Sequence, residues 1–157
     1  MPAARELSNK NNLSSLISLS ITVGLPDTNS ILRYLLKDHP DLPSRATEFW
    51  ESVREGHSIA ILTEGVILEC VYVLQRFYKV PRKKITPEIG ILLSYKGLRK
   101  DGIHIFSKAL EIYQSGSIDF VDCLHITQEI VGIGQVFSFD KDIKKILDTI
   151  TPKILPE

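Results

Sequence analysis

Four acidic residues stand where the sequence predicts the end of a strand or the interior of a helix. They are Asp27, Glu69, Asp122 and Asp140. Asp27 follows the apolar run Leu19–Leu25, and Asp140 follows Val136–Phe139. In open α/β sheets ligands bind beyond the carboxyl ends of the strands, so we expect these acids to share one pocket. Oxygen ligands without histidine or cysteine favour Mg²⁺ or Mn²⁺ over zinc, and the pattern therefore predicts a divalent metal site.

Three of the four acids also have a simpler interpretation. Asp27 can cap the helix that contains Ser30–Leu36, and Asp140 can cap the one that contains Ile143–Leu147. Asp122 lies in the first turn of a predicted helix, where the helix dipole favours an acid. Each of these three acids, considered alone, is therefore explained without a metal.

Glu69 is harder to explain, because it lies inside Val66–Leu74, a predicted helix that is apolar on nearly every side. A buried carboxylate must be paired, bind a metal or take up a proton. The alternative to a metal is a salt bridge to Arg76, Lys79 or another base. Two carboxylates about 4 Å apart repel by roughly 4 kcal/mol at an effective dielectric of about 20, so four gathered acids favour a bound cation.

Short β-like runs alternate with longer helical patterns along the chain. The segments are Leu19–Leu25, Ser30–Leu36, Arg45–Arg54, Ile59–Leu62, Glu64–Tyr78, Ile85–Leu98, Ile103–Phe106, Lys108–Tyr113, Phe120–Val131, Val136–Phe139 and Ile143–Leu147. This alternation predicts an α/β fold with a mainly parallel sheet, in which Ile103–Phe106 and Val136–Phe139 are β-like. Residues 1–17 are expected to form a flexible polar extension, and residues 18–157 a single domain.

The composition excludes several classes of protein. The chain has 157 residues, of which 43% are hydrophobic and 24% charged, too apolar for a disordered protein. Basic and acidic residues balance at 19 each, so a nucleic acid would have to be bound by local patches. Cys70 and Cys123 lie in apolar segments, as expected for reduced thiols in a cytoplasmic protein. The apolar run Leu13–Leu25 is too short for a membrane-spanning helix, which needs about 20 apolar residues.

Four short motifs surround the acids in a fixed order. They are Asp27–Thr28–Asn29 before the predicted helix Ile31–Leu35, Leu68–Leu74 around Glu69 with its continuation Phe77–Arg82, Asp119–Leu124, and Ser138–Phe139–Asp140. In this order and from Asp27 onward, they resemble the motifs of the PIN-domain nucleases, in particular the VapC toxins of bacterial toxin–antitoxin pairs. The first strand departs from the family, which usually has an unbroken aliphatic strand where this chain has Ser18, Ser20, Gly24 and Pro26, and the N-terminal extension is also unusual for the family.

The resemblance implies a three-layer α/β/α sandwich and a Mg²⁺- or Mn²⁺-dependent endoribonuclease that forms homodimers and is inhibited by a small antitoxin. It also implies that Asp122 binds the metal and that Asp119 supports it. We expect Asp27 and Asp122 to be the principal ligands, and Glu69 and Asp140 to hold metal-bound waters or a second ion.

The remaining predicted site residues are polar or basic. Thr28 and Ser138 could orient the acids or a phosphate, although turn formation also explains them, and Asn29 completes the first motif. Contacts to RNA are expected from a dense basic run at residues 79–84 and from more isolated cations; a solvated loop is the alternative for the basic run. The predicted RNA contacts are Arg33, Arg82, Lys83, Lys84 and Lys141.

Two other functions compete with a toxin ribonuclease. A PIN nuclease could process RNA as a housekeeping enzyme, and a neighbouring antitoxin gene would favour the toxin instead. An inactive α/β regulatory module, such as a receiver-like domain, would use its acids for phosphorylation. Such a module has no use for a carboxylate inside an apolar helix, so Glu69 argues against it.

Overall fold

The computed structural model describes residues 21–37 and 45–150, and these form three short parallel strands and seven helices. The strands are β1 (Thr22–Gly24), β2 (Ser58–Ile61) and β3 (Leu98–Arg99), hydrogen-bonded in the order β1-β2-β3. The helices are α2 (Thr28–Leu36), α3 (Arg45–Glu55), α4 (Glu64–Arg76), α5 (Arg82–Leu93), α6 (Ile103–Ser115), α7 (Phe120–Ile130) and α8 (Lys141–Ile150). The α/β sandwich with a parallel sheet that the sequence predicts is confirmed.

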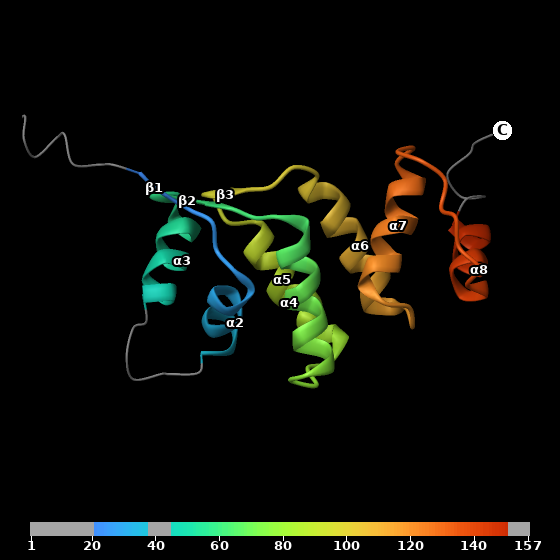
Figure 1. Cartoon of the computed structure of the whole chain (residues 1–157), viewed down its shortest axis with the longest axis horizontal. Helices are drawn as coiled ribbons and strands as arrows, with labels where there is room; N and C mark the ends of the chain where they lie inside the picture. The colour runs from blue at the N-terminus through green and yellow to red at the C-terminus, as the bar shows by residue number, and fades with distance from the viewer. Residues whose placement is uncertain (1–20, 38–44, 151–157) are drawn as a thin grey trace, which may run out of the picture.

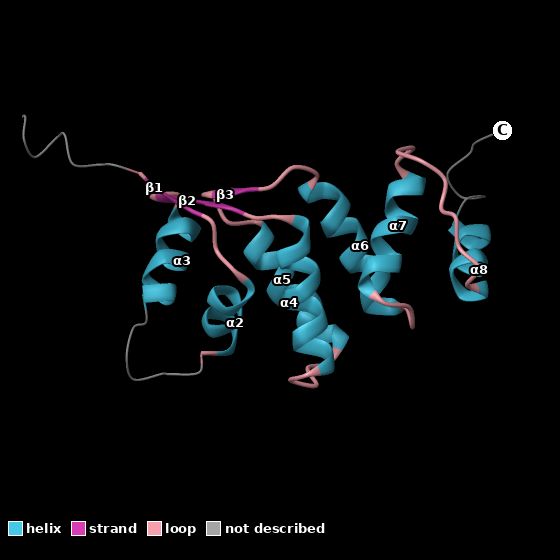
Figure 2. Cartoon of the chain, viewed as in Figure 1, coloured by secondary structure: helices cyan, strands magenta, loops and turns pink. Residues whose placement is uncertain are grey.

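The sheet positions the first acid because each strand runs directly into a turn and a helix. In Figure 1 helices α2, α3, α4 and α5 lie below the strands, and Figure 2 shows the short loops that join them. Register pairs Val23 with Ile59 and Gly24 with Ala60. Gly24 faces α3, because a Cβ atom there would come within 2.6 Å of the Phe49 ring. Val23 therefore points to the other face of the sheet, since successive side chains alternate.

Close packing at β3 requires a glycine beside the strand. A Cβ atom on Gly97 would lie 1.9 Å from the carbonyl oxygen of Ser58, so no other residue fits there without moving the backbone. The amide of Ala60 donates to the Gly97 carbonyl over 3.0 Å, which starts the pairing of β2 with β3. The sequence-based expectation that residues 85–98 are all helical is wrong at this end, because helix α5 stops at Leu93 and Leu98 belongs to β3.

The β-like run Ile103–Phe106 is also helical, and forms the first turn of α6. A short apolar stretch of this kind occurs in both strands and helices. The helical spacing of the apolar residues that follow shows that this one belongs to a helix. Phe106, Ala109, Leu110 and Tyr113 recur at helical spacing and are all buried in the core.

The run Val136–Phe139 is not a strand in this structure. It lies in an extended loop between α7 and α8, without regular secondary structure. The Val136 amide donates to the Glu129 carboxylate at 2.5 Å, which ties the loop to the end of α7. Phe137 and Phe139 are 90% and 93% exposed. The expected strand is therefore unpaired in the described part of the chain.

Some expectations lie outside the described residues. These are the polar extension at residues 1–17 and the first residues of the run Leu19–Leu25, of which the structure describes Ile21 onward. No helix in residues 21–37 and 45–150 is long and apolar enough to cross a membrane.

Candidate functional site

Asp27 and Glu69 meet at one pocket, where the end of β1 passes into α2. Asp27 is the N-cap of α2, and its Oδ1 accepts a hydrogen bond from the Ser30 amide at 2.8 Å. Thr28 is buried, and its Oγ1 donates to Oε2 of Glu69 over 2.5 Å. Both acids line a pocket of about 460 Å³ with Asn29. Asp27 therefore caps helix α2 and lines the pocket at the same time.

The expectation that Glu69 is buried is wrong. Its side chain is exposed, whereas Ile67, Cys70 and Val71 on the same helix are buried. Helix α4 places the Glu69 carboxylate at the pocket. Because the residues next to Glu69 in the sequence are apolar, hydrophobic periodicity alone does not predict that its side of the helix is exposed. Glu69 makes no ion pair within the described residues, and Arg76 pairs instead with Asp119, at 3.4 Å.

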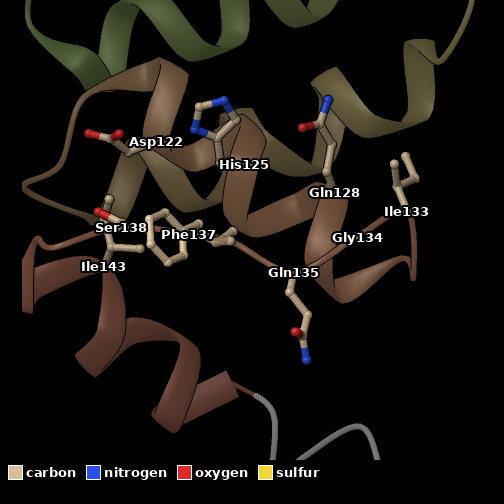
Figure 3. A pocket seen from close by; sticks show the side chains of 10 residues that line it. Asp122, His125, Gln128, Ile133, Gly134, Gln135, Phe137, Ser138 and Ile143 are labelled. Atoms are coloured by element: carbon tan, nitrogen blue, oxygen red, sulfur yellow. The ribbon is translucent and has the colours of Figure 1, made fainter.

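Asp122 lies at a second pocket of about 490 Å³, between α7 and the loop that follows it. Figure 3 shows Asp122 and His125 on α7 beside Phe137 and Ser138 of that loop. Burial raises the pKa of Asp122, and the negative charges of Asp119 and Asp140 raise it further, while His125 lowers it. Asp122 is therefore placed among other acids.

Asp140 is close enough to Asp122 to raise its pKa, and it also caps α8. Its Oδ1 accepts from the Asp142 amide at 2.8 Å, and its own amide donates to Ser138 Oγ at 3.1 Å. Ser138 thus fixes the backbone just before Asp140. The capping interpretation holds here, as it does for Asp27.

Asp119 is the N-cap residue of α7 and joins this helix to α4. Its carboxylate lies 3.4 Å from Arg76 and 3.9 Å from Arg82. The Arg76 and Asp119 side chains are both more than half exposed, so this pair contributes at most about 1 kcal/mol. Asp119 supports the position of the α7 terminus that carries Asp122.

The four predicted ligands form two halves rather than one cluster. Asp27 and Glu69 line one pocket, and Asp122 lies near Asp140 at the other. In residues 21–37 and 45–150 no group of three or more His, Cys, Asp or Glu side chains is arranged to hold a metal ion. The half at Asp27 and Glu69 offers carboxylate oxygens, whereas His125 adds an imidazole beside Asp122 in the other half. Mg²⁺ is commonly held by one or two carboxylates plus water and phosphate, so the carboxylates of each half fit such an ion.

The expectation that Arg82 contacts RNA is not supported by its surroundings. Its guanidinium donates to the backbone carbonyls of Gly116, Ser117 and Ile118, at 3.3, 3.3 and 2.5 Å. The same group lies 4.4 Å from the centre of the Tyr113 ring. Arg82 therefore holds the α6–α7 turn, and a phosphate would have to compete with these bonds.

The other predicted RNA contacts remain available on the surface. Arg33 on α2, Lys83 and Lys84 on α5, and Lys141 on α8 are all exposed. Sequence reasoning gave no role to Phe77 and Tyr78, which line the pocket of Asp27 and Glu69 and are both exposed. The signal available in the sequence was the pair of adjacent aromatic residues that directly follows an apolar helical segment.

Comparisons with known proteins identify the family of this chain. Residues 25–147 match the PIN domain family, which covers all four acids. A VapC ribonuclease of Aquifex aeolicus (strain VF5) is 27% identical over 130 residues, which is 82% of this chain and 96% of that protein. No solved structure matches the chain significantly. With the family match spanning most of its length, this chain belongs to the PIN-domain family.

Proposed function

We propose that this chain is a Mg²⁺- or Mn²⁺-dependent endoribonuclease and the toxin of a type II toxin–antitoxin pair. The observation that carries the proposal is the pocket where Thr28 holds Glu69 beside Asp27. An N-cap acid and a helix acid from distant parts of the chain face one cavity there, as a metal-dependent nuclease requires. The similarity to a VapC ribonuclease supports the choice of RNA as substrate and of toxin as role.

The family resemblance assigns a role to each acid, and these roles require that the two halves of the site come together. Asp27 and Asp122 are the principal ligands, and Glu69 and Asp140 hold water or a second ion. A bound Mg²⁺ or Mn²⁺ supplies an activated water and neutralises the phosphate. Thr28 fixes one oxygen of Glu69, which leaves the other oxygen of that carboxylate free to accept a proton or a hydrogen bond.

RNA binding relies on local charge, since the net charge of the chain is zero. Lys83 and Lys84 lie on α5 after the turn that follows Phe77 and Tyr78, and Arg33 lies on α2, six residues after Asp27. Lys141 follows Asp140 directly. These cations offer positive charge for the phosphate backbone, and the aromatic pair in the pocket of Asp27 and Glu69 offers faces on which an unpaired base can stack.

The toxin proposal includes a small antitoxin partner, a homodimer and a cytoplasmic location. A housekeeping RNA-processing nuclease would share the acids but would not be inhibited by the product of a neighbouring gene. Expression of this chain with and without the protein encoded beside it separates the two, because only a toxin is rescued by that protein.

The direct test is cleavage of single-stranded RNA by the purified protein with Mg²⁺ or Mn²⁺. Asp27→Asn and Asp122→Asn are each expected to abolish cleavage while the circular dichroism spectrum and the melting temperature stay near those of the wild type. Asp148→Asn, an exposed acid late in α8, is the matched control and should cleave normally. Cleavage that continues unchanged in EDTA would refute the proposal.

A further inference from the structure

One edge of the sheet is open in the described part of the chain. Strand β1 pairs with β2 alone, and its other edge has no partner among the described residues. The side chains of Ile21, Val23 and Leu25 are 57%, 57% and 78% exposed. Parallel sheets are normally covered on both faces, and an exposed apolar edge strand is a template for pairing with another segment. We call these three residues and their backbone the β1 edge.

The loop between α7 and α8 carries a matching unpaired segment. Val136–Phe139 is extended and has strand composition, yet the structure pairs it with no strand among the described residues. Phe137 and Phe139 are almost fully exposed and contact each other edge to face, with ring centres 5.5 Å apart. Two exposed phenylalanines of this kind are unusual on a soluble surface.

The β1 edge and segment 136–139 lie far apart within one chain. In Figure 1 β1 is at one end of the molecule, and the loop before α8 is at the other. The loop is held there by the bond from the Val136 amide to Glu129 and by Ile143 of α8, which is buried. One chain in this conformation therefore presents an open edge and an open strand that do not meet.

We propose that two copies of the chain exchange residues 136–139, each copy adding this segment in parallel to the β1 edge of the other. The exchange is reciprocal, so a closed dimer leaves neither surface open. It also brings the apolar side chains of the two segments side by side on the faces of one sheet. A second copy fits better than an unrelated partner, because the chain itself supplies both complementary surfaces.

The exchange would join the two halves of the acidic site. Asp140 follows the added segment directly, and Asp27 follows β1. In a parallel pair both acids lie at the carboxyl end, so Asp140 of the partner subunit would lie beside Asp27. This consequence for catalysis rests on the proposed function, whereas the strand exchange does not.

Engineered disulfides test the pairing. A Val23→Cys chain mixed with a Phe137→Cys or a Phe139→Cys chain is expected to form a covalent dimer on oxidation, seen on a non-reducing gel and by mass spectrometry. The native thiols of Cys70 and Cys123 are buried and should not interfere. As a control, the Phe variant is replaced by an Ile91→Cys chain, in which the cysteine stands at an exposed position on α5. This chain should not link to Val23→Cys. A chain carrying Val23→Cys and Phe137→Cys that closes a disulfide within itself, or a failure of every pair to link, overturns the proposal.

Solution mass gives a second readout without new cysteines. The double variant Phe137→Ser and Phe139→Ser is expected to be a monomer by light scattering, while Tyr72→Ser, another exposed aromatic, leaves the dimer intact. A wild-type monomer, or a dimer that survives the double variant, overturns the proposal. Neither measurement depends on RNA cleavage, so strand exchange without nuclease activity would refute the proposed function alone.

Mixing inactive variants tests the shared site. Asp27→Asn and Asp140→Asn are each expected to be inactive alone, but a mixed dimer has one site with both acids intact. Random reassociation should therefore restore about a quarter of wild-type cleavage. A mixture that stays inactive while each variant still dimerises would show that Asp27 and Asp140 act within one chain.

Discussion

Replacing Thr28 by valine tests the feature on which the site depends. The Thr28 side chain is 8% exposed at the first residue of α2, and its Oγ1 donates to Glu69 Oε2. Valine keeps the shape of the side chain and removes the hydroxyl donor. The substitution therefore releases the Glu69 carboxylate without opening a cavity beside it.

The expected cost has a structural and a functional part. A hydrogen bond to a charged group contributes about 1.5–3 kcal/mol. Glu69 is exposed, so water replaces the lost donor and the cost should fall at the low end, about 1.5 kcal/mol. For a chain of this size that lowers the melting temperature by about 3–6 °C. Loss of a residue that orients a ligand typically weakens metal affinity or activity by about 10–100-fold.

Two measurements separate these parts. Thermal unfolding by circular dichroism gives the stability change, and RNA cleavage over a Mg²⁺ titration gives the midpoint for metal. Thr28→Ser keeps the hydroxyl and should restore the metal midpoint. If Thr28→Val cleaves RNA with the wild-type Mg²⁺ midpoint and rate, the bond to Glu69 has no role in the site.

Three further predictions concern Arg82, the two cysteines and Tyr34. Arg82→Lys should destabilise the fold by about 2 kcal/mol, since lysine cannot satisfy three carbonyls at once, and a variant that melts normally but binds RNA weakly would refute this. Burial raises the pKa of Cys70 and of Cys123 to about 12, so a thiol reagent at mildly alkaline pH should modify neither until the protein unfolds. Burial, a hydrogen bond with the Tyr95 hydroxyl and a hydrogen bond that Tyr34 donates to Glu51 raise the pKa of Tyr34, so the unfolded phenol ionises first. Stability measured in urea should then fall as the pH rises above about 10, and Tyr34→Phe should flatten that fall.

The sequence predicted best what local chemistry decides. Asp27 and Asp140 cap helices as their residue type predicts, and the βα alternation correctly predicts a parallel sheet. Prediction from the sequence failed where the same residues fit two different interpretations. The exposed side of α4 carries Glu69 among apolar neighbours, and only packing against the rest of the fold shows which side of the helix faces the core.

Segment 136–139 shows the limit of local prediction more sharply. Its residues have strand propensity, but a strand exists only when an edge accepts its backbone hydrogen bonds, and that edge is set by distant parts of the chain. The same four residues can therefore be a loop in one arrangement and a strand in another, with an unchanged sequence. The position of Asp140 depends on this pairing, because the acid is fixed to the end of the segment. Whether the acids form one site is thus decided by strand pairing, and pairing is a property of the assembled chain or dimer.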